Sequence, residues 1–147
     1  MVKSKEAVVV LLHKNSEVFL LQMRDFSPHI ILPGHWGCFG GGLQPSESVM
    51  DGARRELAEE IKYCPDDIEE YRSFYGDGQT LHVCHAELKV PLSRLQLCEG
   101  MDMGLFTAEE IISGRLYSFK LKKDFPVSPP LIVVIKDYLE FIYSCKR

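Results

Sequence analysis

The sequence of 147 residues lacks a long hydrophobic run, an excess of basic residues and any CxxC pair. Its first apolar stretch covers only residues 7–12, ends at His13-Lys14, and is too short for a signal-peptide core or a membrane span. No small-residue cleavage site follows it. We therefore expect neither membrane association nor a targeting segment.

The charge balance excludes a second class of protein. Seventeen Lys and Arg residues stand against 21 Asp and Glu residues, which gives a net charge of −4. A protein that coats duplex nucleic acid is normally basic, so we expect no duplex partner. A small phosphate-bearing substrate remains compatible, because its site needs only local positive charge or a bound metal ion.

Cysteine usage indicates the compartment. An odd number of cysteines without CxxC spacing argues against a secreted disulfide framework and favours a reducing cytoplasm. We expect most of them to be small buried hydrophobes. The five are Cys38, Cys64, Cys84, Cys98 and Cys145.

The length predicts a single domain over residues 1–147 with a proper hydrophobic core. Predicted strands are mixed with helices rather than strictly alternating, which indicates an α/β or α+β fold with a mixed sheet. The predicted strands cover residues 7–12, 18–24, 36–39, 69–75, 79–89, 95–97 and 103–106. The predicted helices run from a Ser46 cap to about residue 61, from Thr107 to Gly114, and over about 131–144.

The densest cluster of charge lies on the first predicted helix. At about 100° per residue, Glu56, Glu59 and Glu60 share one helical face. Like charges at this spacing repel, and a hard divalent cation such as Mg²⁺ or Mn²⁺ would compensate. The alternative is a solvated acidic face in which Asp51, Arg55 and Glu59 form a ladder of ion pairs. A triple-glycine turn before the helix favours the metal site.

The wider pattern then resembles a known family. Residues 41–63 read GGLQPSESVMDGARRELAEEIKY, which is similar to the Nudix box, and every position fits through Glu60. Lys62 replaces the usual Gly and Tyr63 replaces an aliphatic residue, both beyond the ligand positions. The resemblance implies a Nudix-type α/β/α sandwich that covers the whole chain.

The resemblance also implies a chemistry, namely Mg²⁺-dependent attack of water on the pyrophosphate of a nucleoside diphosphate derivative. Glu56 is one candidate for the general base and Glu99, in the loop near residue 100, is the other. Arg24 is expected to contact substrate phosphate. Aromatic residues that could stack on a base are Phe26, Trp36, Phe74 and Phe119. By resemblance, Gly41, Glu56, Glu59 and Glu60 would bind metal, while Arg55 and Glu47 would orient the ligand carboxylates.

The substrate stays open at this point. The sequence lacks the markers of the ADP-ribose, diadenosine polyphosphate and coenzyme A subgroups, which leaves a (deoxy)nucleoside triphosphate or a nucleotide sugar. We favour the triphosphate. The alternatives are another nucleoside diphosphate-X pyrophosphatase and a Nudix module that binds a nucleotide without cleaving it. A homodimer is left open.

Overall fold

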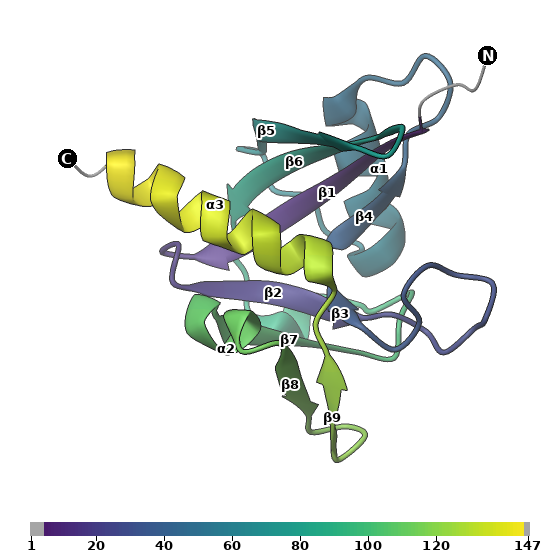
Figure 1. Cartoon of the computed structure of the whole chain (residues 1–147), viewed down its shortest axis with the longest axis vertical. Helices are drawn as coiled ribbons and strands as arrows, with labels where there is room; N and C mark the ends of the chain where they lie inside the picture. The colour runs from purple at the N-terminus through teal and green to yellow at the C-terminus, as the bar shows by residue number, and fades with distance from the viewer. Residues whose placement is uncertain (1–4, 146–147) are drawn as a thin grey trace. The chain divides into compact units, whose positions relative to one another are not determined.

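A computed structural model describes residues 5–145, which fall into two compact units (Figure 1). Within these residues, the first unit contains 5–14 and 38–98, and the second contains 15–37 and 99–145. Each unit combines strands with helices, so the expected mixed α+β class is confirmed. The single domain remains a prediction.

The first unit is built on a mixed sheet. The central strand β1 (Lys5–Lys14) pairs antiparallel with β4 (Phe39–Gly42) on one side and parallel with β6 (Gln79–Glu87) on the other. Strand β5 (Glu69–Gly76) pairs antiparallel with β6 through a tight turn, as the sequence predicts. Two further elements complete the unit, helix α1 (Val49–Ile61) and the short 3₁₀ helix η1 (Leu92–Arg94).

The core of this unit lies between α1 and the sheet. Val8 and Val10 of β1 are fully buried, as are Leu57 and Ile61 of α1, whose four-residue spacing in the sequence predicts one apolar stripe on the helix. Burial of each such side chain contributes about 1.5–3 kcal/mol. Hydrophobic packing therefore fixes the rotation of α1, and with it the direction in which its carboxylates point.

Three local predictions were wrong in this unit. The helix cap is Ser48, whose hydroxyl accepts a hydrogen bond from Asp51 N–H at 3.1 Å, whereas Ser46 precedes the helix at φ +63°. The triple glycine continues strand β4 rather than forming a turn. Residues 95–97 form no strand, because the chain there follows η1 into a loop.

The second unit has its own antiparallel strands. Strand β2 (Val18–Met23) pairs with β3 (Trp36–Gly37) and with β7 (Asp102–Thr107). The predicted capping box at Thr107 opens the short helix α2 (Ala108–Ile112). A hairpin of β8 (Arg115–Ser118) and β9 (Lys123–Pro126), which the sequence analysis missed, leads to helix α3 (Pro129–Cys145).

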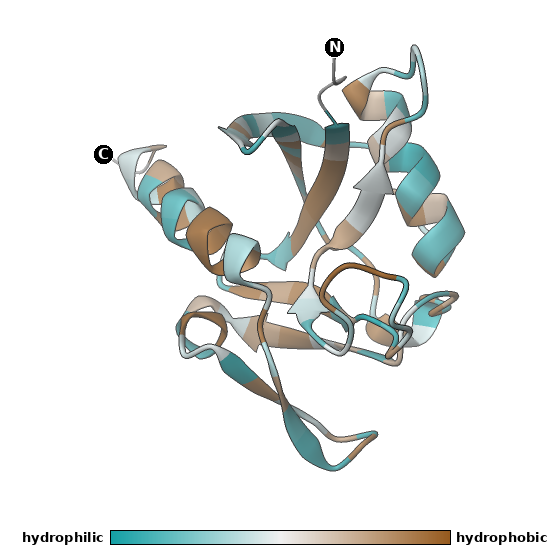
Figure 2. Ribbon diagram, turned by 45° about the vertical axis from the view of Figure 1, so that its right-hand side comes forward, coloured by the Kyte–Doolittle hydropathy of each residue, from teal (hydrophilic) through white to brown (hydrophobic). Residues whose placement is uncertain are grey.

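Aromatic residues fill the core of the second unit. Phe19 and Tyr138 meet edge to face with ring centroids 6.0 Å apart, and Trp36 meets Phe106 in the same way at 4.8 Å. Figure 2 shows α3 carrying both hydrophobic and hydrophilic residues along its length. In the part of the chain that the structure describes, no helix is long and apolar enough to cross a membrane.

Candidate functional site

The carboxylates of α1 do not all lie in solvent. Glu56 is 8 % exposed and Glu60 is 2 % exposed, and both are on the buried side of the helix with Leu57 and Ile61. An ionised carboxylate in such surroundings is costly unless hydrogen bonds or cations compensate its charge. A solvated acidic face, the alternative reading of this helix, does not describe these two residues. It does describe Glu59, whose side chain is 53 % exposed.

Arg55 is the cation that organises this face. Its Nε and Nη2 donate to the two oxygens of Glu47 at 2.8 and 2.9 Å, a bidentate pair across eight residues. Its Nη1 donates to Glu56 Oε1 at 3.0 Å and lies 3.5 Å from Glu59 Oε2. Nη2 also donates to the carbonyl oxygen of Gly42 at 3.1 Å. One guanidinium therefore ties three carboxylates to strand β4.

The protonation states follow from these contacts. The hydrogen bond from Arg55, followed by that from the backbone of Gln44, lowers the pKa of Glu47 to about 2. The same contact with Glu47 raises the pKa of Arg55 above its usual value. Glu47 and Arg55 are thus a permanently charged pair at neutral pH, which suits residues that position other groups.

Strand β4 passes directly over the two buried carboxylates. Gly40 N–H donates to Glu60 Oε2 at 2.8 Å. A Cβ atom at Gly41 would come within 2.6 Å of Glu56 Oε1, so only a glycine leaves that carboxylate in place. Burial raises the pKa of the neighbouring Cys38 thiol to about 12, and the charge of Glu60 adds to this effect. The glycines are needed for close approach of the backbone to carboxylate oxygens.

The donor chemistry fits a hard divalent cation. Glu56, Glu59 and Glu60 offer oxygen ligands at i, i+3 and i+4 of one helix, and the oxygen-rich set matches the preference of Mg²⁺ or Mn²⁺. Over residues 5–145, no three acidic, His or Cys side chains converge closely enough to hold an ion as they stand. Glu59 is exposed and can rotate, so its rearrangement would complete such a set.

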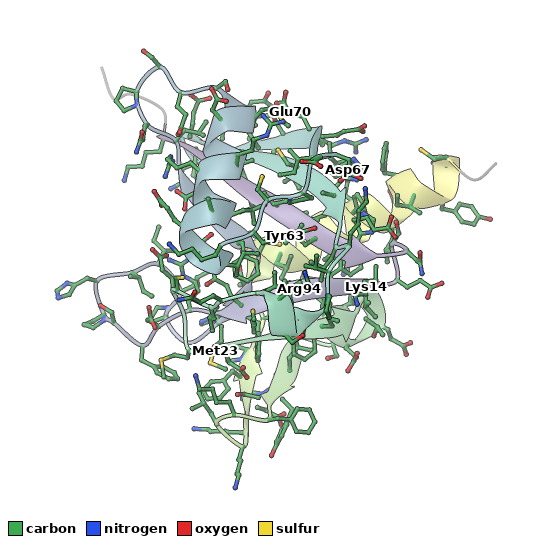
Figure 3. All side chains as sticks on the ribbon, turned by 180° about the vertical axis from the view of Figure 1, so that it is seen from behind. Lys14, Met23, Tyr63, Asp67, Glu70 and Arg94 are labelled. Carbon is green, nitrogen blue, oxygen red and sulfur yellow. The ribbon has the colours of Figure 1, made fainter. Side chains whose placement is uncertain are left out.

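The helix exit accommodates both departures from the motif. Lys62 adopts the left-handed conformation at φ +56° and ψ +34°, the geometry that a glycine would adopt without strain. Tyr63 lies beyond the end of α1, on the segment that leads to β5 (Figure 3), and its hydroxyl accepts from Lys89 N–H at 3.4 Å. The predicted ligand positions on α1 precede both residues.

Two predicted residues belong to the second unit. Arg24 follows β2, where its backbone N–H donates to the His35 carbonyl at 3.0 Å. Its Nε is buried without a hydrogen-bond partner, so this guanidinium has an unused donor. Glu99 is exposed in the loop before β7. Contact of Arg24 with substrate phosphate and the role of Glu99 as general base stay predictions. The aromatic candidate Trp36 is fully buried and donates to the Leu116 carbonyl, which leaves no ring face for a base.

Sequence reasoning missed two contributors to the site. Ser48, the helix cap, was detectable, because Ser48-Val-Met-Asp51 has the spacing of a capping box. The Gly40 N–H that holds Glu60 was not, because a backbone donor carries no residue signature. The six box residues that the motif singled out do lie together in the structure, at Gly41, Glu47, Arg55, Glu56, Glu59 and Glu60.

The structure combines a mixed α+β fold with an acidic helix, α1, that lies beneath the glycine strand β4. The model of the NUDIX domain family matches residues 3–124. The chain therefore belongs to the Nudix hydrolase family, a family that generally uses divalent metal ions.

Individual relatives are more distant. The nucleoside triphosphatase NudI of Escherichia fergusonii is 32 % identical over 59 residues, which is 40 % of this chain and 40 % of that protein. Thus the match spans well under half the length of these curated relatives. Among solved structures, the NUDIX domain of Shewanella oneidensis NrtR, complexed with ADP ribose, has a TM-score of 0.73 at 17 % identity. That similarity covers 97 % of this chain and 90 % of the other. A structure from a study of MutT from Aliivibrio salmonicida and Vibrio cholerae has a TM-score of 0.66 at 15 % identity, covering 89 % and 95 %.

Proposed function

We propose that this protein is a Mg²⁺-dependent pyrophosphohydrolase that cleaves the phosphoanhydride of a (deoxy)nucleoside triphosphate. The observation that carries the proposal is the set of carboxylates on α1 beneath the glycine strand β4. Arg55 donates to Glu56 and Glu59, and Gly40 N–H donates to Glu60; Glu56 and Glu60 are buried. Buried carboxylate charge lowers the stability of the fold unless cations or hydrogen bonds compensate it. Family membership makes a divalent cation the natural occupant.

Each residue then has a distinct task. Glu56, Glu59 and Glu60 would hold the ion with the Gly41 carbonyl oxygen, and Mn²⁺ could replace Mg²⁺. Bound there, the ion would neutralise phosphate charge and lower the pKa of a coordinated water molecule. Arg55 is a positioning residue, because its Nη1 donates to the Glu56 carboxylate while its Nε and Nη2 are held by Glu47.

The attacking water must lose a proton to a carboxylate. Glu56 is the candidate within the box, and its hydrogen bond from Arg55 orients its carboxylate. Glu99 is the candidate outside the box, on an exposed loop that leaves its carboxylate accessible. Comparison of the pH profiles of Glu56→Gln and Glu99→Gln would assign the role. The general base is the residue whose replacement removes the acidic limb from the plot of rate against pH.

The triphosphate substrate has two supports. The similar 59-residue segment occurs in proteins named nucleoside triphosphatases. Arg24 has a guanidinium with an unused buried donor, which suits an additional contact with a phosphate oxygen. We propose that Arg24 binds substrate phosphate.

Two alternatives remain to be separated from this reading. One is hydrolysis of a nucleotide sugar or another nucleoside diphosphate derivative. The other is nucleotide binding without cleavage. The structural similarity to a NUDIX domain that was crystallised with ADP ribose keeps both in view. Free cysteines throughout agree with a reducing compartment, and a cytoplasmic location is part of the proposal.

The test is a substrate panel at fixed Mg²⁺ concentration. It contains nucleoside triphosphates, nucleotide sugars, ADP-ribose, dinucleotides and coenzyme A, with products identified by mass. Glu60→Gln serves as the inactive variant, and Glu140→Gln on the exposed side of α3 is the matched control. We expect Mg²⁺-dependent release of pyrophosphate or phosphate from a triphosphate, lost in Glu60→Gln and kept in Glu140→Gln.

Other outcomes are equally informative. Cleavage of another class alone would replace the triphosphate in this proposal. Tight binding of a nucleotide with no cleavage of any compound would favour the non-catalytic module. Near-normal turnover by a folded Glu60→Gln protein would contradict the assignment of the metal site.

A further inference from the structure

The hairpin of β8 and β9 is an ordered platform rather than a loose loop. Ser118 at its end is fully buried, donates to Asp102 Oδ2 on β7 at 2.7 Å, and accepts from Leu121 N–H at 3.0 Å. The Lys122 N–H closes the four-residue connection by donating to the Ser118 carbonyl at 2.7 Å. In Figure 1 the hairpin extends away from β7 and α2 of the same unit. The backbone that presents its side chains is therefore ordered by hydrogen bonds within the same unit.

Two aromatic rings lie exposed on this platform. Phe119 is 85 % exposed and Tyr117 is 42 % exposed, with ring centroids 5.0 Å apart in an edge-to-face arrangement. Exposure of a phenyl ring to this degree costs solvation free energy and contributes nothing to the core. A second aromatic contact supports the base of the hairpin: the ring centroids of Phe125 on β9 and Phe26, in the loop between β2 and β3, are 5.7 Å apart.

Positive charge gathers around the same rings. Residues 115–126 contain four of the 17 basic residues of the chain and only one of its 21 acidic residues. This local excess stands out in a protein with a net charge of −4. Lys123 also lies over the ring of Phe125, with Nζ 5.7 Å from the centroid. The basic residues are Arg115, Lys120, Lys122 and Lys123, and all four are exposed.

We infer that the β8–β9 hairpin binds single-stranded nucleic acid, with a base stacked on Phe119 and the flanking phosphates held by the lysines. Exposed aromatic rings interleaved with basic side chains are the arrangement by which proteins hold unpaired strands. A duplex offers no free base face to Phe119. The prediction that duplex nucleic acid is not a partner therefore stands beside this one.

A membrane surface fits the same hairpin less well. Phe119 shares its short connection with Lys120 and Lys122, so insertion of the ring into hydrocarbon would draw ammonium groups after it. A single exposed phenyl ring also offers little apolar area for insertion. A single-stranded nucleic acid in water can stack its bases on the aromatic residues and place its phosphates beside the basic residues.

The experiment measures binding of a fluorescently labelled 12-nucleotide oligouridylate to the full chain by anisotropy, at several salt concentrations. EDTA is present, so that hydrolysis at the acidic helix does not enter the result. We expect Phe119→Ala to weaken binding by roughly fivefold to a hundredfold, the range for loss of one base–aromatic stack. The control Tyr143→Ala removes an aromatic residue of α3 that is 64 % exposed, and should leave affinity unchanged.

The lysines have a separate signature. Each phosphate contact on a single strand contributes about 0.7 to the slope of log affinity against log salt. Replacement of all three of Lys120, Lys122 and Lys123 by Gln should therefore reduce the magnitude of that slope by about 2. Lys136→Gln on α3 is the matched control and should not change the slope. All these side chains are exposed, and circular dichroism would verify that each variant is folded.

Three results would overturn the inference. The first is no oligonucleotide binding by the wild-type protein at low salt. The second is equal affinity of the wild-type and Phe119→Ala proteins. The third is Phe119-dependent sedimentation with phosphatidylcholine–phosphatidylserine vesicles without oligonucleotide binding, which would assign the hairpin to an anionic membrane surface instead.

Discussion

A methyl group at Gly41 is the smallest change that should disable the site without unfolding the protein. The new Cβ would lie 2.6 Å from Glu56 Oε1, 2.8 Å from Cδ and 2.9 Å from Oε2. Ordinary contact begins at 3.4 Å, so the carboxylate must move by about 0.8 Å. Misplacement of a reacting group by about 1 Å can cost a hundredfold in rate. Gly41→Ala should therefore lower kcat by about two orders of magnitude.

The neighbouring glycine supplies the control. A Cβ at Gly42 would have no heavy atom within 4 Å, and Gly42 also lies in β4. Both variants add the same methyl group to the same strand and keep the backbone carbonyls. The assay compares kcat on the substrate found by the panel, together with Tm. Equal kcat for Gly41→Ala and Gly42→Ala would refute the claim that close approach of β4 sets the position of Glu56.

Two further predictions concern stability. Lys62→Gly removes a side chain from a left-handed residue and should raise the free energy of unfolding by about 0.5–1 kcal/mol. Lys136→Gly within α3 should lower the free energy of unfolding by about 1 kcal/mol. Urea denaturation measures both changes, and a destabilised Lys62→Gly protein would contradict the cap assignment. Burial, the largest cause, lowers the pKa of both His13 and His85 below 6.5, so the fold favours their neutral forms. Stability should be fully present above pH 6.5 and fall as the pH drops through the lowered pKa values. A His13→Gln/His85→Gln protein should lose less stability between pH 7 and pH 5, and an unchanged pH profile would count against this explanation.

The sequence was most informative where the spacing of residues along a helix alone decides which side chains share a face. Glu56, Glu59 and Glu60 are placed on one face by helical periodicity. The structure gives Glu56 and Glu59 the common anchor Arg55, whereas Glu60 accepts from Gly40 N–H. The apolar stripe through Leu57 and Ile61 is equally predictable, because apolar residues at that spacing lie on one side of a helix and are buried there.

Non-local contacts were beyond the reach of such reasoning. The hydrogen bond from Gly40 N–H to Glu60 joins residues 20 positions apart and depends on how β4 pairs with β1. The triple glycine predicts a turn because glycine favours turns. In the structure, Gly41 instead leaves space for the carboxylate of Glu56.

The missed β8–β9 hairpin has a different cause. Only half of its alternation follows hydrophobicity, since Leu116 is buried as expected, but Ser118 is also buried while Tyr117 is exposed. A pattern search that expects polar residues outside and aromatic residues inside cannot recognise such a strand. The buried serine is stabilised by Asp102, a partner that only the fold supplies.

The central claim is that the carboxylates of α1 bind a divalent cation. Titration of Mn²⁺ into the wild-type protein, followed by electron paramagnetic resonance, measures this directly and independently of any substrate. Glu59→Gln alters an exposed side chain, and Asp51→Asn on the same helix is its matched control. We predict saturable Mn²⁺ binding that Glu59→Gln weakens by about tenfold or more and Asp51→Asn leaves unchanged. Equal Mn²⁺ affinity of all three proteins, or no saturable binding by the wild type, would contradict the account.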